Sequence, residues 1–397
     1  MLLVPYAGAL CWPRKPSIRG FLLSLRADQR LENAAPPPFQ RLSQRSLFEM
    51  HSYPATASFS ETQEHFKTMD HTTNRRQVLK SLMAASIAAS PAFAFAKSDW
   101  PKKSIRLVVP FAPGGTSSII ARTVGQELNQ ILGVSVIIDN KGGGGGVPAM
   151  LDVAKSPADG YTFIVGHIGS LAVNPFIYPN SGYNVNRDFS AVTLLTMVPN
   201  MFVVHKDVPA NNFKEFVAYV KSRPGKVNYA SAGIASAGHL SVESLKHTVG
   251  LQMDHIPYRG TGPALADVLA GRIEFFSAGT PALMPHIRSG ALRVLAVGTT
   301  KRISILPDTP TVQELGYPGF ETSQWYGINA PAKVPADILS AFRDACVKAL
   351  NASTVQTRLA HDSAQAVGNT PQEYADFILA EQKRWKVVVD AAKITAG

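Results

Sequence analysis

Five loops of the chain combine glycine with serine or threonine, and each follows a short apolar run. They are Pro113–Ser118, Ile168–Ser170, Ser231–His239, Arg259–Gly262 and Ser277–Thr280. Glycine lets a bound molecule approach the backbone, while hydroxyl and backbone N–H groups donate hydrogen bonds. Neutral donors of this kind hold a carboxylate without burying an opposing charge. One such loop alone is more typical of a helix cap, but five after successive strands favour an anion site.

Motifs for catalysis and for metal binding are incomplete in the sequence. Ser236 within Gly233–Gly238 stands one residue away from its place in a nucleophile elbow. The glycine run Gly142–Gly146 fits neither a dinucleotide-binding fingerprint nor a phosphate-binding loop. The histidines His239, His247 and His255 recur every eight residues, and this spacing does not place them on one face of a helix. We therefore expect no catalytic residue, no metal and no cofactor. A serine hydrolase using Ser236 and His239 is the weaker alternative.

The composition argues against a nucleic-acid-binding protein. The formal net charge is +11, but residues 97–397 carry 28 Lys and Arg against 22 Asp and Glu. No dense basic run with interleaved aromatic residues occurs, and the mild positive excess is suited to attracting small anions. Cys346 is the single cysteine after residue 96, and its helical spacing from Phe342 and Leu350 predicts a buried thiol.

Apolar strands alternate with amphipathic helices from residue 97 onward, which predicts an α/β fold with parallel sheets. The predicted strands are Ile105–Phe111, Val134–Asp139, Thr162–His167, Ala191–His205, Val227–Ser231, Met253–Tyr258, Ile273–Ser277 and Leu292–Thr299. Helices are predicted at Ser117–Leu132, after Asn212, at Ala264–Ala270 and after Thr370.

The run Ala191–His205 is long for a strand and contains Pro199, so we expect a strand that leaves one sheet and enters another. A second crossing is expected near Glu321–Ala330. Two crossings give two lobes, residues 97–199 plus 321–397 and residues 200–320. One large sheet is the alternative.

Residues 69–96 have the three parts of an export signal. Asn74–Lys80 is basic and contains paired arginines, Ser81–Ser90 is apolar, and Ala94–Ala96 offers a small-x-small cleavage site. The paired arginines resemble a twin-arginine signal, and the apolar run is too short to span a membrane. An amphipathic helix is the alternative. Met69 stands just ahead of this segment, so we expect residues 1–68 to be an upstream extension outside the natural product.

An ordered set of motifs resembles the Bug-type receptors, the extracytoplasmic solute-binding components of tripartite tricarboxylate transporters. The motifs are Ile105–Phe111 with Pro113-Gly114-Gly115, Asp159–Thr162, Pro224–Gly233, Pro257–Gly260 and Leu306–Thr311. The resemblance covers nearly all of residues 99–390. It implies a type II periplasmic-binding-protein fold, a Venus flytrap of two α/β lobes with a ligand cleft between them. It also implies a periplasmic monomer that delivers a bound acid to membrane subunits.

The resemblance further implies which residues contact the ligand. The family typically holds one carboxylate with the Pro-Gly-Gly loop and with the loop that is Gly166–Ser170 in this chain. The candidates in the first lobe are Gly115, Thr116, Ser117, Ser118, Gly166 and Ser170. The candidates in the second lobe are Ser231, Ser236, Tyr258 and Thr280. Many relatives have an aspartate where this chain has Ser118, which makes an amino-acid ligand less expected.

The resulting expectation is a receptor rather than an enzyme. A small carboxylate-bearing molecule binds both lobes and thereby favours the closed form. The partner is expected to be a tripartite transporter, with a signalling kinase as the alternative. The sequence leaves the identity of the acid open.

Overall fold

The computed structural model describes residues 99–396, and the predicted upstream extension and export signal lie outside these residues. The strands are β1 (Ile105–Val109), β2 (Val136–Asn140), β3 (Thr162–His167), β4 (Phe189–His205), β5 (Asn228–Ser231), β6 (Asp254–Pro257), β7 (Phe275–Gly279), β8 (Leu292–Val297), β9 (Ser323–Pro331) and β10 (Gln365–Ala366).

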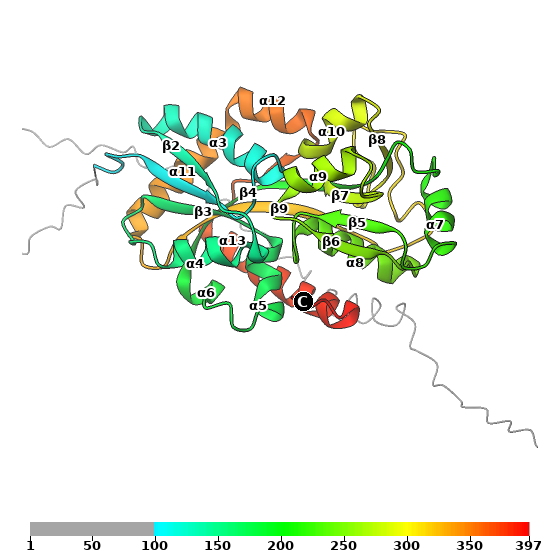
Figure 1. The fold of residues 1–397 in the computed structure, drawn as a ribbon. Helices are drawn as coiled ribbons and strands as arrows, with labels where there is room; N and C mark the ends of the chain where they lie inside the picture. The colour runs from blue at the N-terminus through cyan, green and yellow to red at the C-terminus, as the bar shows by residue number, and fades with distance from the viewer. Residues whose placement is uncertain (1–98, 397) are drawn as a thin grey trace, which may run out of the picture. The chain divides into compact units, whose positions relative to one another are not determined.

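The helices connect these strands in nearly regular alternation (Figure 1). They are α3 (Thr116–Leu132), α4 (Val147–Ala154), α5 (Asn174–Ile177), α6 (Val185–Asp188), α7 (Phe213–Lys221), α8 (Ala237–Val249), α9 (Thr261–Leu269), α10 (Thr280–Arg288), α11 (Ala336–Asn351), α12 (Ser353–His361) and α13 (Pro371–Ala392), with a 3-10 turn η1 (Gly144–Gly146) and a π-helical turn η2 (Gly169–Val173). In the described part of the chain, no helix is both long enough and apolar enough to cross a membrane.

The long strand β4 belongs to two sheets. Its first part, up to Pro199, pairs with β9, and its second part, from Asn200, pairs with β7 and β8. The first sheet runs in the order β2-β1-β3-β9-β4, and the second continues from β4 through β7 and β5 to β6. We call the elements around the first sheet lobe 1 and those around the second sheet lobe 2. The pairing changes where the sequence predicted a crossing, and the boundaries at 199/200 and 320/321 stay predictions.

The sheets are not purely parallel, which corrects the expectation from strand–helix alternation. The outer strands pair in parallel, as in β1 with β2 and β5 with β6. The strands at the crossing, β4 and β9, pair antiparallel with each other and with their neighbours β3 and β7. The reason is that β4 carries the chain out of lobe 1 whereas β9 carries it back, so they run in opposite directions.

Local sequence signals fix several helix ends. Thr370 and Glu373 form a complete capping box at α13, and the Asn212 side chain accepts a hydrogen bond from the Glu215 backbone N–H at α7. Gly133 ends α3 in the left-handed conformation that glycine adopts without strain. Helix α9 begins at Thr261, earlier than predicted, because Pro263 is tolerated within the first turn of a helix.

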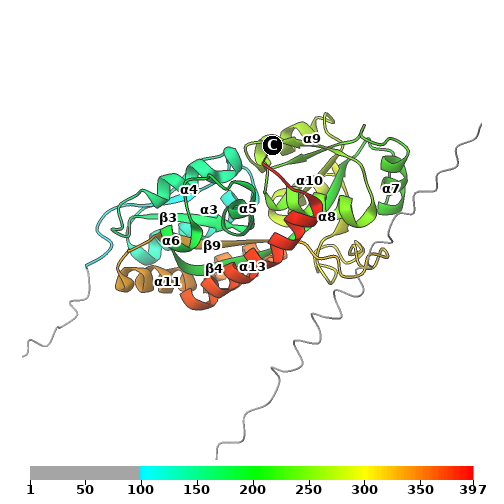
Figure 2. The ribbon, with the colours of Figure 1, turned by 90° about the horizontal axis from the view of Figure 1, so that it is seen from below.

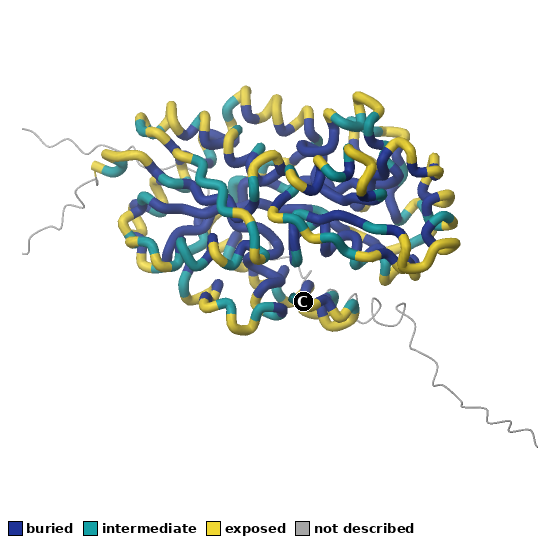
Figure 3. The backbone as a smooth tube through the Cα atoms, viewed as in Figure 1, coloured by how far each residue is buried: buried dark blue, intermediate teal, exposed yellow. Residues whose placement is uncertain are grey.

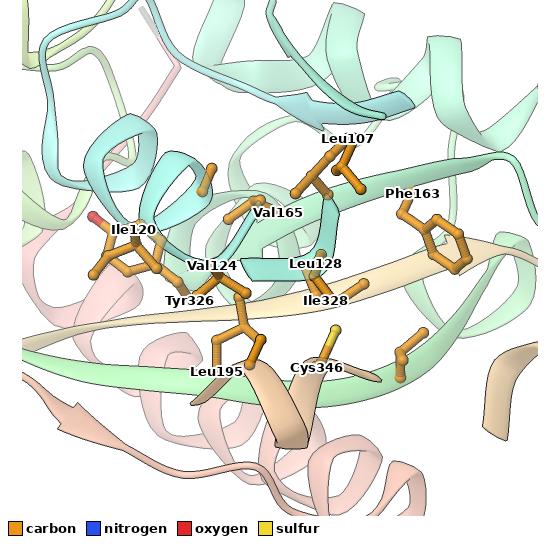
Figure 4. Packing of buried hydrophobic residues seen from close by; sticks show 14 of the residues in the cluster. Leu107, Ile120, Val124, Leu128, Phe163, Val165, Leu195, Tyr326, Ile328 and Cys346 are labelled. Atoms are coloured by element: carbon orange, nitrogen blue, oxygen red, sulfur yellow. The ribbon is translucent and has the colours of Figure 1, made fainter. Parts of the chain in front are cut away.

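Buried residues concentrate on the strands, and the outward faces of the helices are exposed (Figure 3). In lobe 1, helices α3 and α11 cover one face of the sheet, where Leu128, Phe163 and Cys346 pack together (Figure 4). The side chain of Cys346 has no exposed surface, and burial raises the pKa of its thiol to about 12. The predicted buried thiol is therefore confirmed.

The last helix, α13, connects the two lobes. It packs against η2 and β4 of lobe 1 and reaches α8 of lobe 2 (Figure 2). Trp325 of β9 donates a 2.8 Å hydrogen bond to the buried carboxylate of Glu381 on this helix. The helix thus lies along the crossing strands, where it contacts elements of both lobes.

Candidate functional site

A narrow cavity lies where loops and strand ends of the two lobes meet, and it encloses about 20 Å³. Lobe 1 contributes the end of β1, the start of α3, the end of β3 and part of β9. Lobe 2 contributes the start of α8, the start of α9 and the end of β7. The lining residues are Phe111, Ser117, His167, Ile168, Ala232, Ser236, Ala237, Gly238, Thr261, Ser277, Ala278, Gln324, Trp325 and Tyr326.

None of these lining residues is Lys, Arg, Asp or Glu. Instead, the first turns of three helices line the cavity, α3 from lobe 1 through Ser117, and α8 and α9 from lobe 2 through Ala237, Gly238 and Thr261. The first backbone N–H groups of a helix lack partners within the helix and carry a partial positive charge. An anion is therefore favoured in this cavity, although no full positive charge lines it.

His167, the last residue of β3, lines the cavity in a defined tautomer. Its Nδ1 accepts hydrogen bonds from the backbone N–H groups of Gly169 (2.7 Å) and Ser170 (3.1 Å), so the ring proton of the neutral imidazole is on Nε2. Burial lowers the pKa of His167 to about 3, so the ring is neutral at ordinary pH. The ring stacks on Phe111 at a centroid distance of 4.5 Å. Within the described chain, its Nε2 has no hydrogen-bond partner.

Ser277 faces the same cavity from lobe 2. It is the polar side chain of β7, it is 1% exposed, and its hydroxyl also lacks a partner among the described residues. Gln324, which lines the cavity, donates to Asn200 and accepts from the Tyr326 hydroxyl, and Asn200 donates to Ser241 at 2.6 Å. This network fixes the Gln324 side chain at the crossing of β4 and β9.

The predicted contacts of lobe 1 occupy different places around the cavity. Ser117 lines it. Gly115 lies at the contact between the lobes, where a Cβ atom would stand 2.8 Å from Cβ of Thr261. The Ser118 hydroxyl accepts a 2.7 Å hydrogen bond from Asn140, so it holds the loop rather than facing the cavity.

The other three candidates of lobe 1 lie behind the lining. Thr116 is buried beside Gly279, and its hydroxyl has no partner in the part of the chain that is described. Gly166 has no room for a side chain because Leu171 packs onto it. The backbone N–H of Ser170 orients the ring of His167, which gives Ser170 a positioning role.

The predicted contacts of lobe 2 also separate. Ser236 lines the cavity, and its hydroxyl caps α8 by accepting a hydrogen bond from the backbone N–H of His239. Ser231 is fully buried outside the lining, and its hydroxyl lies 2.6 Å from Nε2 of His255. The Thr280 hydroxyl donates to the carbonyl oxygen of Asp362, which ties α10 to the end of α12.

Tyr258 lies on a neighbouring cavity of about 240 Å³, together with Tyr178, Arg259 and the glycine run Gly143–Gly146. Its hydroxyl donates a 2.6 Å hydrogen bond to Asp267. Burial and this carboxylate raise the pKa of Tyr258 to about 12. The tyrosine therefore stays protonated at ordinary pH, with its hydroxyl held by lobe 2.

The two lobes touch through backbone as well as side chains. The Ala112 N–H donates a 3.0 Å hydrogen bond to the Arg259 carbonyl oxygen, which joins the β1–α3 loop to the β6–α9 loop. Several glycines make this approach possible. A Cβ atom on Gly262 would overlap with the carbonyl oxygen of Pro113, and one on Gly169 would overlap with that of Ala235. The described conformation is therefore a closed one.

A hydrolase reading finds little support in this geometry. The ring Nδ1 of His239 accepts a hydrogen bond from the Ala235 backbone at 3.2 Å, and the Ser236 hydroxyl is occupied by the helix cap. No hydrogen bond joins these two side chains among those of the described residues. The paired serine and histidine are instead Ser231 and His255, and that serine has no exposed surface.

A family model for the tripartite tricarboxylate transporter family receptor matches residues 120–394. The chain belongs to this receptor family. The protein BugT of Bordetella pertussis (strain Tohama I) is 34% identical over 313 residues, which is 79% of this chain and 95% of BugT. The family resemblance seen in the sequence motifs is thereby confirmed.

Solved structures agree with this membership of the receptor family. The periplasmic binding protein BugD superposes with a TM-score of 0.73 at 32% identity, over 75% of this chain and 99% of BugD. Rpa4515 of R. palustris, solved with adipate, gives a TM-score of 0.73 at 36% identity, over 75% of this chain and 99% of that one. The predicted two-lobe binding-protein fold is confirmed.

The cavity is also lined by His167, Ser277 and Gln324, which were not among the predicted ligand contacts, although Ser277 begins one of the five predicted loops. His167 ends a predicted strand and Ser277 ends another, so position alone placed both at the ligand-binding edge of a sheet. The sequence does not reveal that their side-chain donors have no hydrogen-bond partner, because this depends on contacts between residues far apart in the chain.

Proposed function

We propose that this receptor captures a small organic acid through a carboxylate, closes its lobes around it, and delivers it to the membrane subunits of a tripartite transporter. The observation that carries this proposal is a cavity between the lobes that is lined by neutral donors and by the first turns of α3, α8 and α9, with no charged side chain. The adipate found in the related Rpa4515 is an acid of this class.

Neutral donors suit a receptor that must release its cargo. A carboxylate that accepts several hydrogen bonds from N–H and O–H groups is well stabilised without a buried ion pair. Pairing with a buried arginine would add a large desolvation cost. Ser117 of lobe 1 and Ser236 of lobe 2 are the predicted residues that we propose as ligand contacts.

Closure follows from the position of the cavity. The described cavity of about 20 Å³ is close to the size of one water site, so an acid as large as adipate enters only when the lobes separate. A ligand that touches both lobes then favours a form closed around it, with a wider cavity than the described one, over the open form, and shifts the population towards it. We propose that the protein acts in the periplasm and that the membrane subunits recognise its closed form.

The binding step is tested by calorimetric titration of the purified chain with a panel of di- and tricarboxylic acids and aromatic acids, including adipate. We expect at least one acid to bind with micromolar affinity, about −8 kcal/mol. The matched control is the primary amide of the same acid, which keeps the shape but removes the charge. The proposal fails if no acid binds, or if the acid and its amide bind equally.

Delivery to a transporter is tested separately. The acid-loaded chain, immobilised on beads, is offered detergent-solubilised membranes of the source cells. We expect it to retain transporter membrane subunits, and the ligand-free chain to retain less. Retention of a sensor kinase in their place would contradict the transport assignment and leave the binding step intact.

A further inference from the structure

Two residues that line the cavity, one from each lobe, carry a buried side-chain polar atom without a hydrogen-bond partner in the described chain. Six buried side-chain polar atoms have no hydrogen-bond partner in the described chain, and the cavity lining contains two of their residues, His167 and Ser277. Buried polar groups are almost always hydrogen-bonded, so each exception in a folded protein needs an explanation. Because both residues line the same cavity, one bound molecule could be the hydrogen-bond partner of both atoms.

Both groups can donate a hydrogen bond, and His167 Nε2 can only donate. Nε2 of His167 carries the ring proton, because Nδ1 accepts two backbone N–H groups. The Ser277 hydroxyl can rotate to aim its proton at an acceptor. A partner that satisfies both must therefore present acceptor atoms, and the α8 N-terminus between Ser236 and Gly238 adds backbone donors to the same cavity. A carboxylate has only acceptors and suits this set.

We propose that Nε2–H of His167 and the hydroxyl of Ser277 hold the ligand's carboxylate at the N-terminus of α8. This inference rests on the proposed function and assigns the carboxylate to one end of the cavity. One donor belongs to each lobe, so the carboxylate itself bridges the lobes and stabilises the closed form.

Ser277→Ala separates binding from folding. The hydroxyl has no partner to lose, so removing it should leave the thermal midpoint of the ligand-free chain unchanged or raised. The affinity for adipate, or for the tightest acid of the panel, should fall about 10- to 100-fold. Thr196→Val is the matched control, because the Thr196 hydroxyl is equally buried and unpartnered but Thr196 is not a lining residue of the cavity. It should leave the affinity unchanged.

His167 also orients the loop at Gly169 and Ser170, and two variants separate this positioning role from ligand binding. His167→Asn keeps an acceptor near the Nδ1 position and removes the Nε2 donor. His167→Gln keeps a donor near the Nε2 position and removes the loop acceptor. If His167 binds the acid directly, His167→Asn should lose at least 10-fold in affinity for the acid, and His167→Gln should lose less. A purely structural role predicts the reverse order.

Nitrogen-15 NMR of labelled histidine gives a second readout. For His167 we expect a protonated Nε2 and an unprotonated Nδ1, with the Nε2–H resonance moving when the acid is added. If the wild-type chain binds no acid, the proposed function fails and this inference with it. If the wild type binds an acid while Ser277→Ala and His167→Asn bind it equally well, the inference alone is overturned.

Discussion

Two buried histidines, His167 and His239, and the half-buried His255 are neutral for the same physical reason. Burial lowers the pKa of His167 and His255 to about 3, and that of His239 to about 4. Their ring nitrogens therefore act as single donors or acceptors rather than as cations. His167 uses this state at the cavity, whereas His239 and His255 stack on each other at 4.2 Å inside lobe 2. The same residue type thus serves the site in one place and packing in another.

The thiol of Cys346 should be inert in the folded protein. It has no exposed surface, and burial raises its pKa to about 12, so little thiolate forms at neutral pH. We expect peptide mass spectrometry after a short alkylation pulse to find Cys346 unmodified, and modified after unfolding in urea. Modification of Cys346 without denaturant would mean that α11 opens far more readily than its packing implies.

The elements of the site divide into those that bind and those that close. Helices α3 and α8 present their N-termini to the cavity. The β1–α3 loop and the first turn of α9 instead form the contact between the lobes, where glycines allow backbone to approach backbone. This explains why some predicted loop residues line the cavity while others, such as Gly115, lie at the interface.

Gly262→Ala should impair closure without weakening either lobe. Alanine is a better helix former than glycine within α9, but its Cβ would overlap with the Pro113 carbonyl oxygen of the other lobe. We expect the affinity for the acid to fall at least 10-fold, with the unfolding midpoint of the ligand-free chain unchanged within 2 °C or so. Ala266→Ser, on an exposed position of the same helix, serves as the control. Wild-type affinity in Gly262→Ala would show that ligand binding does not need this contact.

The capping box of α13 should contribute to stability alone. Thr370→Ala removes a side chain that accepts the Glu373 backbone N–H, and such losses cost about 1 kcal/mol. Urea unfolding should show this decrease, while calorimetry shows an unchanged affinity because Thr370 lies outside the cavity lining. Thr357→Ala, an exposed position inside α12, should not destabilise. Equal unfolding free energies for the wild type and Thr370→Ala would contradict the role of the cap.

At the scale of the whole described chain, two sheets share β4, and β9 and α13 run along the crossing. The lobes are therefore joined by hydrogen-bonded strands rather than by loops alone. Bulges interrupt the β4–β9 register between Ala191 and Thr193 and between Leu194 and Thr196. These irregular pairs twist the strands as they pass from one sheet to the other.

Stability should fall as the pH drops from about 6.5 towards 4.5. In the unfolded chain these histidines gain protons in this range, while in the folded chain His167, His239 and His255 stay neutral, so protons favour the unfolded state. Each such histidine adds a slope of about 1.4 kcal/mol per pH unit where only the unfolded form is protonated. Urea unfolding at several pH values measures this slope.

A pair of variants makes the pH experiment specific. His255→Gln should flatten the slope, because it removes one neutral, half-buried ring that packs on Tyr229 near Glu243 and Lys246. His247→Gln, on the exposed face of α8, should leave the slope unchanged. A slope that is flat in the wild type between pH 6.5 and 4.5 would refute the neutral state of the buried histidines.

Much of the fold could be predicted from the sequence, because it depends on local signals. Each of these signals is contained in a short stretch of sequence. Examples are the capping pairs at Asn212 and Thr370, the apolar strands and the long run through Pro199. The antiparallel pairing of β4 with β9 could not be predicted so, since it joins residues more than a hundred positions apart. The same limit applies to His167 and Ser277, whose unpartnered donors are evident only once both lobes enclose one cavity.

The central claim is that an acid held by neutral donors draws the two lobes together. Small-angle X-ray scattering of the purified chain, with and without a saturating acid from the panel, measures this directly. We predict a smaller radius of gyration with the acid, and no decrease in Gly262→Ala at the same concentration. Saturation of the wild type by calorimetry, with a radius of gyration that does not change, would contradict it.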